Sequence, residues 1–593
     1  MSELFKPIPS KVGQLVNDVR SGRIGLPDLQ RPFVWADNKV RDLFDSMMKG
    51  YPIGYVMLWE SPSNYEEKKS TIGDGKKIYE EPKELVIDGQ QRLTALIAAM
   101  YGVQVKDKNY KYREIKISYR PLTKEFAVWT SAYDKDTEWI PKLSDVFLAK
   151  ENNTFSSFRR KFIQRANEGR TRKGLALITD AEEDAIENSL NALLGLTDFS
   201  LPTLEIGYDA DEEDVAEIFV RVNSGGQKLN ENNFIQTLIS VYENETGDKM
   251  EKFAEESRIP ADKTSYNNVL AIDQAHLIRM AVGLGFKRAR LKYAYMLLRG
   301  KDLDTGKFSE DERQKNLDIF KDALDKAMNI TTWHAFLNCI GDAGYHSSKQ
   351  IASSNVVVFS YIFYLIGKHE YHLTELQLNK CIRKWFFVSA ITYYYSNSTE
   401  STAERQFADL RNVQTGEEYI AYFDTLISTI FTNDYFNVTL PYELNSSAGV
   451  SPIWNGFVAS QIVLNTNLLF GNSPISKFFM PGTSGTKNAM DRHHIFPKAW
   501  LSKQGYDTDR ERNQLANFAY IDYANNIDIS DNPPIDYVDH YRESLGAEYD
   551  IVCKGHALPD NFEAMDYQLF LERRRVLMAE IVRKAYQKLC EMP

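Results

Sequence analysis

The spacing of apolar residues changes from that of a strand to that of a helix within residues 84–100, ELVIDGQQRLTALIAAM. Residues 85–87 form a short unbroken apolar run, which is typical of a buried strand. From Leu93 to Met100 apolar residues recur at intervals of three and four, which is typical of a helix. The pattern therefore predicts a strand, a polar turn and a helix in immediate succession.

The pattern along the whole chain divides it into three blocks. Residues 1–240 mix strand-like and helix-like segments, and residues 241–430 have mainly helical spacing. Residues 431–593 are rich in loop residues and end in a long helical segment. An apolar run at 356–366 is too short to span a bilayer and predicts a buried helix. The predicted fold class is α+β and multidomain, with domain boundaries near 240 and 430.

Length, charge and cysteine content narrow the class of protein. The chain has 593 residues, too many for one hydrophobic core, and a net charge of −11. This charge argues against coating of nucleic acid along the whole chain but leaves local basic surfaces open. Four distant cysteines argue against a zinc ribbon or a disulfide framework, and the N-terminus lacks an apolar signal core. We expect a soluble cytoplasmic protein without a membrane partner.

The polar turn after the first strand consists of Asp88, Gly89, Gln90, Gln91 and Arg92. A glycine lets the backbone approach a ligand closely, and the first amides of a helix carry the positive end of its dipole. Such a turn can bind an anion, and an arginine beside it suits phosphate oxygens. The carboxylate can cap the helix or help hold a metal that accompanies a nucleotide. The alternative is an ordinary capped helix whose arginine makes a surface salt bridge.

Two further segments in the first block combine polar residues with turns. GLPDLQRPFVW places Gln30 and Arg31 beside a loop, and AEIFVRVNSGGQKLN runs a helix into a turn at Asn223. Alone, the first is explained as a structural turn and the second as a glycine C-cap. Together with YPIGYVMLW and VIDGQQRLTAL, they resemble the N-terminal domain of GmrSD-type modification-dependent restriction systems. Phosphorothioate-sensing nucleases carry the same type of domain.

This resemblance covers about the first 230–240 residues and implies a ParB/sulfiredoxin-like fold. In that fold a Gly-x-x-Arg turn binds a nucleotide. The resemblance therefore implies that residues 88–92 bind a nucleoside triphosphate and support its hydrolysis, with Gln30, Arg31 and Asn223 near the same pocket. The identity of the nucleotide stays open among GTP, ATP, CTP and UTP.

The second informative segment is MDRHHIFPKAWL, which contains His493 and His494. Adjacent residues of a strand point to opposite sides, so one histidine can bind a metal while the other accepts a proton from water. Lys498 follows where a phosphate can be contacted. The alternative is a pair of incidental polar residues in a loop.

With the downstream segment RNQLANFAYIDYANNIDISDNPP, this stretch resembles an HNH (ββα-metal) nuclease domain of the same restriction family. The resemblance implies that His493 and Asn526 bind a metal ion. It makes His494 the general base and Asn517 the residue that holds the loop carrying it. So few protein ligands favour Mg²⁺ or Mn²⁺ with bound water over a structural zinc. Asn513, Asn525 and Asn532 compete for these roles, and His540 is a candidate for a third metal ligand.

A basic segment, SFRRKFIQRANEGRTRK, stands out in this acidic chain. It contains Arg159, Arg160 and Lys161, which we predict to contact DNA phosphates. A solvated helix face explains the same pattern.

These features predict a nucleotide-regulated, metal-dependent DNA endonuclease of bacterial antiphage defence that senses or acts on modified phage DNA. Nucleotide state would bias the nuclease between inactive and active arrangements. A homodimer would make cuts in both strands easier. One alternative is a ParB-like, nucleotide-gated DNA-binding protein without nuclease activity, and another is a nuclease that acts on RNA.

Overall fold

The structure is a computed structural model with two compact units, Met1–Lys249 and Met250–Pro593. It describes residues 5–25, 33–60, 82–107, 111–208, 210, 215, 218, 244–258, 267–298, 300–302, 305–307, 309–396, 398–447, 451–480 and 490–593. Among these residues, no helix is long and apolar enough to cross a bilayer.

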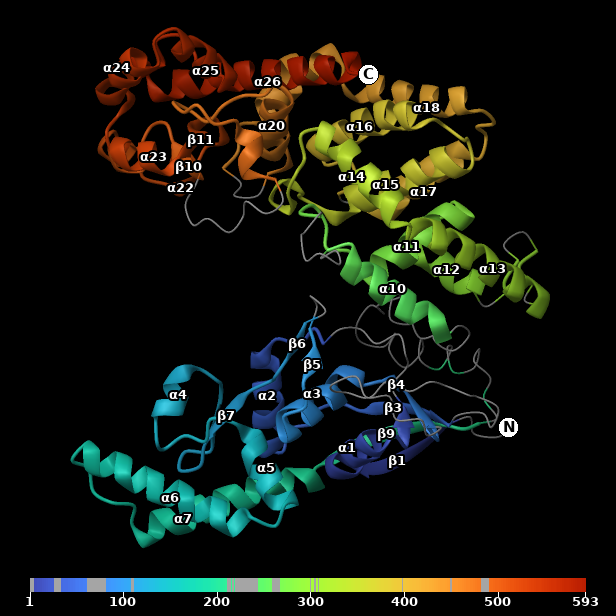
Figure 1. Ribbon diagram of the computed structural model, residues 1–593, viewed down its shortest axis with the longest axis vertical. Helices are drawn as coiled ribbons and strands as arrows, with labels where there is room; N and C mark the ends of the chain where they lie inside the picture. Colours follow the sequence, from blue (N-terminus) through green and yellow to red (C-terminus); the bar gives the residue numbers. More distant parts are fainter. Residues whose placement is uncertain are drawn as a thin grey trace. The chain divides into compact units, whose positions relative to one another are not determined.

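A five-stranded mixed sheet organises the first unit, in the order β1-β9-β3-β4-β2 (Figure 1). β9 pairs antiparallel with β1 and parallel with β3, and β4 pairs antiparallel with β3 and parallel with β2. The central strands β3 and β4 have buried apolar runs, as strands covered on both faces require. The strands are β1 (Phe5–Lys11), β2 (Ile24–Gly25), β3 (Val56–Glu60), β4 (Glu84–Asp88) and β9 (Ser200–Ile206).

The helix predicted after the polar turn is α3 (Gln90–Tyr101), and it forms the centre of the core of this unit. Every residue from Leu93 to Met100 is buried, because small residues between the large apolar ones let other elements pack on all sides of the helix. The other helices are α1 (Val12–Ser21), α2 (Asp37–Met48), α4 (Ser131–Lys135), α5 (Leu143–Glu151), α6 (Phe155–Arg172) and α7 (Asp180–Leu194). Two short strand pairs are β5 (Val105–Lys106) with β6 (Tyr112–Arg113), and β7 (Ile117–Arg120) with β8 (Glu125–Val128).

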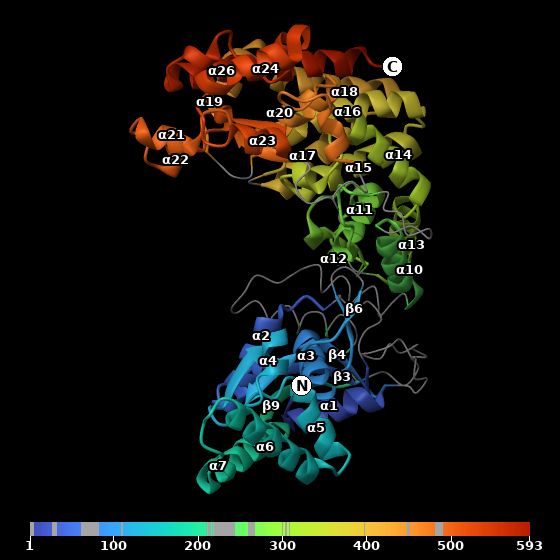
Figure 2. The same ribbon diagram turned by 60° about the vertical axis from the view of Figure 1, so that its left-hand side comes forward.

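Helices dominate the second unit (Figure 2). The apolar run at 356–366 lies in α15 (Ser354–His369), and its residues are all buried, which confirms the buried helix. α15 packs against α16 (Glu375–Ile391), which begins with a capping box at Thr374. The neighbouring helices are α10 (Asn244–Glu256), α11 (Gln274–Phe286), α12 (Leu291–Leu298), α13 (Glu310–Ala327), α14 (Ile330–Asp342), α17 (Thr399–Leu410), α18 (Gly416–Ile430), α19 (Leu440–Glu443) and α20 (Pro452–Val463).

A pair of antiparallel strands, β10 (Met490–His494) and β11 (Phe518–Asp522), lies in the C-terminal part of this unit. The predicted terminal helix is α26 (Tyr567–Glu591), which runs alongside α16 and α20 (Figures 1 and 2). The expected boundary near residue 430 falls inside this unit, and a subdivision there stays a prediction. The remaining helices are α21 (Lys498–Lys503), α22 (Asp509–Arg512), α23 (Tyr523–Ile529), α24 (Pro534–Leu545) and α25 (Tyr549–Gly555).

Candidate functional site

The turn between β4 and α3 is built around Gly89, which has φ +96°. A side chain is strained in this left-handed region, and a Cβ would lie 3.1 Å from Val56 Cγ2 and 3.3 Å from Val56 Cα. Glycine is therefore required both by the backbone angle and by the close approach of β3. Because the N-cap residue is a glycine, it has no side chain to cover the first amides of α3.

Arg92, in the first turn of α3, is held by the segment that precedes β3. Its Nη1 donates a hydrogen bond to the carbonyl oxygen of Tyr55 at 2.6 Å. Its guanidinium lies against Gly54, where a Cβ would come within 2.7 Å of Nη2. Burial lowers the pKa of Arg92, and Asp88 partly opposes this. The arginine is thus a partly buried cation with a fixed direction, unlike the arginine of a surface salt bridge.

Gln91 joins a third sequence motif to this turn. Its Oε1 accepts a hydrogen bond from the backbone N–H of Val34 at 3.0 Å, and the N–H of Phe33 donates to Lys106 O at 2.7 Å. The end of LQRPFVW, the start of GYVMLW and the DGQQR turn therefore meet in one place. The predicted site residues Gln30, Arg31 and Asn223 lie outside the described residues.

The paired histidines stand on β10, and α23 follows directly after its partner strand β11 (Figure 1). His493 is only 4% exposed, and its Nδ1 lies 2.8 Å from Asn526 Oδ1 on α23. Asn526 Nδ2 in turn donates to Asp491 Oδ2 at 3.1 Å. Asp491 and His493 are two residues apart on one strand and so share a face. Their side chains and that of Asn526 form one cluster, the Asp491–His493–Asn526 cluster.

This cluster has the chemical groups for a divalent cation. Burial lowers the pKa of His493 to about 4, so the ring is neutral near pH 7 and has a lone pair to offer. Its Nε2 is buried and has no hydrogen-bond partner among the described residues. The described residues contain no group of three or more His, Cys, Asp or Glu that could hold a metal. Asn526 Oδ1 accepts from Nδ1–H, so the lone pair of His493 lies on Nε2. A cation here would use that nitrogen, one carboxylate, one amide oxygen and water, a set that suits Mg²⁺ or Mn²⁺, and it would replace the contact between His493 and Asn526.

His494 faces a different set of residues. Its Nε2 lies 3.0 Å from Asn513 Oδ1, and its ring packs on Phe518 with centroids 4.5 Å apart. Burial lowers the pKa of His494, and the positive charges of Lys498, Arg492 and Arg512 lower it further. The exposed Lys498 begins α21 and lies 3.7 Å from Asp509. The adjacent histidines therefore have separate partners, and only His494 has positively charged surroundings.

Asn517 is fully buried and connects two loops beside His494. Its Oδ1 accepts from the N–H of Phe496 at 2.9 Å, and its Nδ2 donates to Phe496 O at 3.0 Å and Arg512 O at 3.2 Å. The other candidates are placed elsewhere: Asn525 donates to Phe470 O, while Asn532 and His540 are exposed.

A buried arginine behind this loop has a structural role that the sequence did not indicate. Arg574 on α26 is 0% exposed and donates to Ala516 O at 2.8 Å and to His556 O at 3.0 Å. Burial lowers the pKa of Arg574 to about 9. The residue ties the segment that carries Asn517 to the terminal helix. Nothing in the spacing of residues along the terminal helix distinguishes Arg574 from an exposed arginine. The alternation of side chains along β10, in contrast, could have indicated that Asp491 lies on the same face as His493.

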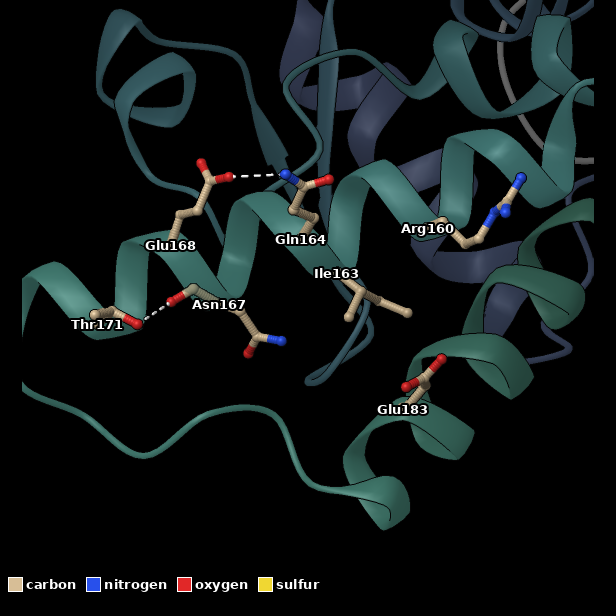
Figure 3. Close-up of a pocket in the computed structure, with 7 residues that line it drawn as sticks. All are labelled: Arg160, Ile163, Gln164, Asn167, Glu168, Thr171 and Glu183. Atoms are coloured by element: carbon tan, nitrogen blue, oxygen red, sulfur yellow. Dashed lines mark hydrogen bonds between the residues drawn. The ribbon is translucent and has the colours of Figure 1, made fainter.

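The basic segment forms α6, where acidic residues of α7 neutralise part of its charge. Arg159 pairs with Glu187, and Arg170 binds Glu182 at 2.9 Å. Arg160 and Lys161 are exposed. Arg160 and Glu183 lie at the same end of a shallow pocket of about 450 Å³ between the two helices (Figure 3). Its mixed charges do not favour an anion.

The fold and the two sites define a multidomain protein with an anion-suited turn in one unit and a histidine–asparagine cluster in the other. Residues 12–240 match the family described as GmrSD restriction endonuclease, N-terminal domain, so this part of the chain is similar to the N-terminal region of such enzymes. The chain is also similar to an uncharacterized protein of Methanocaldococcus jannaschii, with 23% identity over 553 residues that span 88% of this chain and 85% of the relative.

Proposed function

We propose that the protein is a nucleotide-regulated, metal-dependent endonuclease of antiphage defence that cuts or nicks DNA and senses modification. The GmrSD-type N-terminal region supports a restriction-related role with DNA as substrate. Its action would be in the cytoplasm, where phage DNA enters. The finer assignments, an HNH nuclease and a nucleotide-binding turn, come from the resemblance of the sequence motifs, and the geometry of the two sites supports them.

The observation that carries the nuclease proposal is that His493 and His494 have different surroundings. One is buried against Asn526 and Asp491, and the other faces Asn513 among positive charges. The order of two antiparallel strands and a helix around them supports a ββα-metal unit. A metal ligand and a general base must lie near the same phosphodiester, and each needs hydrogen-bond partners of its own.

The surroundings of each side chain support the role that we assign to it. The Asp491–His493–Asn526 cluster would hold Mg²⁺ or Mn²⁺, which when bound stabilises negative charge on a phosphodiester. His494 accepts the proton of a water that attacks phosphorus. Lys498 contacts a phosphate oxygen. Asn517 keeps the loop around His494 in place through its bonds to Phe496.

The turn at Gly89 is the proposed nucleotide site. The first amides of α3 and the oriented guanidinium of Arg92 supply donors for a triphosphate, and Gln91 lies beside them. Asp88, Gln90, Gln30, Arg31 and Asn223 complete the set that we assign to this nucleotide. Arg160 and Lys161 are exposed and are our candidates for contact with DNA phosphates, whereas Arg159 already pairs with Glu187.

The nuclease proposal is tested by cleavage of phage DNA, with and without base or backbone modification, in Mg²⁺ and with each of four nucleotides. We expect His494→Ala to lower the cleavage rate at least about 100-fold, as loss of a general base does. His372→Ala, an exposed histidine of the helical region, is the matched control. Unchanged cleavage by His494→Ala would refute the nuclease assignment and leave a nucleotide-gated DNA-binding protein. Faster cleavage of RNA than of DNA would refute the assigned substrate.

The nucleotide proposal has its own test. Arg92→Ala should weaken binding of a triphosphate at least about tenfold and remove the effect of nucleotide on cleavage. Arg41→Ala on α2 is the control, because that side chain pairs with its own neighbour Asp42. Normal nucleotide binding and normal nucleotide-dependent cleavage in Arg92→Ala would remove the phosphate role from this turn.

A further inference from the structure

Asn513 is the hydrogen-bond partner of the proposed general base. Its Oδ1 lies 3.0 Å from His494 Nε2, although the two residues are on different segments. Asn513 directly follows α22, and its own N–H donates to Asp509 O at 2.9 Å. The contact is therefore made from a backbone that is itself anchored.

Asn517 sets the distance between these two segments. Its Nδ2 donates both to Phe496 O, two residues after His494, and to Arg512 O, one residue before Asn513. A single buried amide thus holds the end of β10 beside the end of α22. Asn517, which stabilises the loop, therefore also places Asn513 beside His494.

The chemistry of this contact determines where the proton on His494 lies. An amide oxygen only accepts hydrogen bonds, so Nε2 must be the protonated ring nitrogen. In a neutral imidazole the lone pair is then on Nδ1. The ring cannot exchange these two roles without losing the bond to Asn513.

We propose that Asn513 is a positioning residue that holds His494 as the Nε2–H tautomer and so makes Nδ1 the proton acceptor. This inference rests on the proposed function, because it names the reacting atom of the same general base. In the step, a water proton moves to Nδ1 as the water oxygen bonds to phosphorus. The bond from phosphorus to the leaving sugar oxygen breaks, and that oxygen takes a proton from solvent. The bond from Nε2–H to Asn513 strengthens as the ring gains positive charge.

Two substitutions separate the acceptor from the shape of the side chain. Asn513→Leu keeps the approximate size and removes the acceptor, and we expect kcat to fall about 10- to 100-fold, as for other residues that orient a reacting group. KM should change less than about threefold, because the loss is confined to the reacting step. Asn513→Asp retains an acceptor for Nε2–H and should recover most of kcat. Asn532→Leu, the same change at an exposed asparagine of this region, is the control.

The tautomer itself is measured by ¹⁵N NMR of the full chain labelled at histidine, with His494→Gln to assign the signal. We expect a protonated Nε2 and an unprotonated Nδ1 in the unmodified chain, and a mixture of tautomers in Asn513→Leu. An unchanged tautomer in Asn513→Leu would overturn the inference, whether or not kcat falls. A wild-type chain that cleaves no nucleic acid would instead refute the proposed function, while the tautomer measurement would still decide the role of Asn513.

Discussion

The buried amide of Asn517 offers the sharpest test of how the C-terminal site is held together. Asn517→Leu keeps the volume of the side chain and removes its three hydrogen bonds, to Phe496 N–H, Phe496 O and Arg512 O. At about 1 kcal/mol for each bond, the loop loses about 3 kcal/mol. The Phe496 N–H is left buried and unpaired, which adds about 1–3 kcal/mol. We therefore expect local opening to become easier by about 4–6 kcal/mol.

Hydrogen exchange of the full chain measures this opening directly. Peptides that cover residues 494–500 should lose protection by a factor of about 1000 or more, because about 1.4 kcal/mol corresponds to tenfold. Cleavage should fall in the same variant, since both His494 and Asn513 depend on the loop. Asn532→Leu should change neither quantity. Protection within about threefold of the unmodified chain would show that the three bonds do not hold the loop.

Two further predictions concern the first unit. Gly54→Ala should weaken nucleotide binding about tenfold or more in a titration, because its Cβ would lie 2.7 Å from Arg92 Nη2 and displace the guanidinium. Gly50→Ala has a similar positive φ but would meet no described atom within 4 Å, so equal losses in both variants would assign the effect to backbone strain instead. The bonds from Arg170 lower the pKa of Glu182 from 4.5 to about 2, so this pair contributes stability above pH 4.5 that is lost as pH falls toward 2. Thermal unfolding of Glu182→Gln should depend less on pH across this window, and an unchanged pH dependence would contradict the assignment.

Local sequence patterns were sufficient for several elements of the fold. The strand, turn and helix at 84–101 follow from the change of apolar spacing, and the glycine in the sequence marks the position of the turn. The buried helix at 356–366 and the terminal helix follow from run length and periodicity. In each case neighbouring residues contain the whole signal, because helices and strands have short periods.

The assignment of the asparagines required the tertiary structure. Several asparagines lie between residues 512 and 533, and the sequence left them in competition. The register of β10 with β11 places Asn526 against His493, and the bonds of Asn517 bring Asn513 to His494. Spacing alone cannot distinguish these positions, because the intervening loop can close in several ways.

Taken by itself, the sequence determined where polar turns interrupt apolar elements and that two adjacent histidines would face opposite sides of a strand. It also determined the match of residues 12–240 to the GmrSD-type N-terminal domain. Only the tertiary structure decided that the guanidinium of Arg92 packs against Gly54 and that Asp491 lies beside Asn526. It also decided that acidic residues of α7 neutralise part of the charge of α6. The reason is physical: periodicity is a local property, whereas hydrogen bonds and ion pairs between distant segments depend on how the whole core packs.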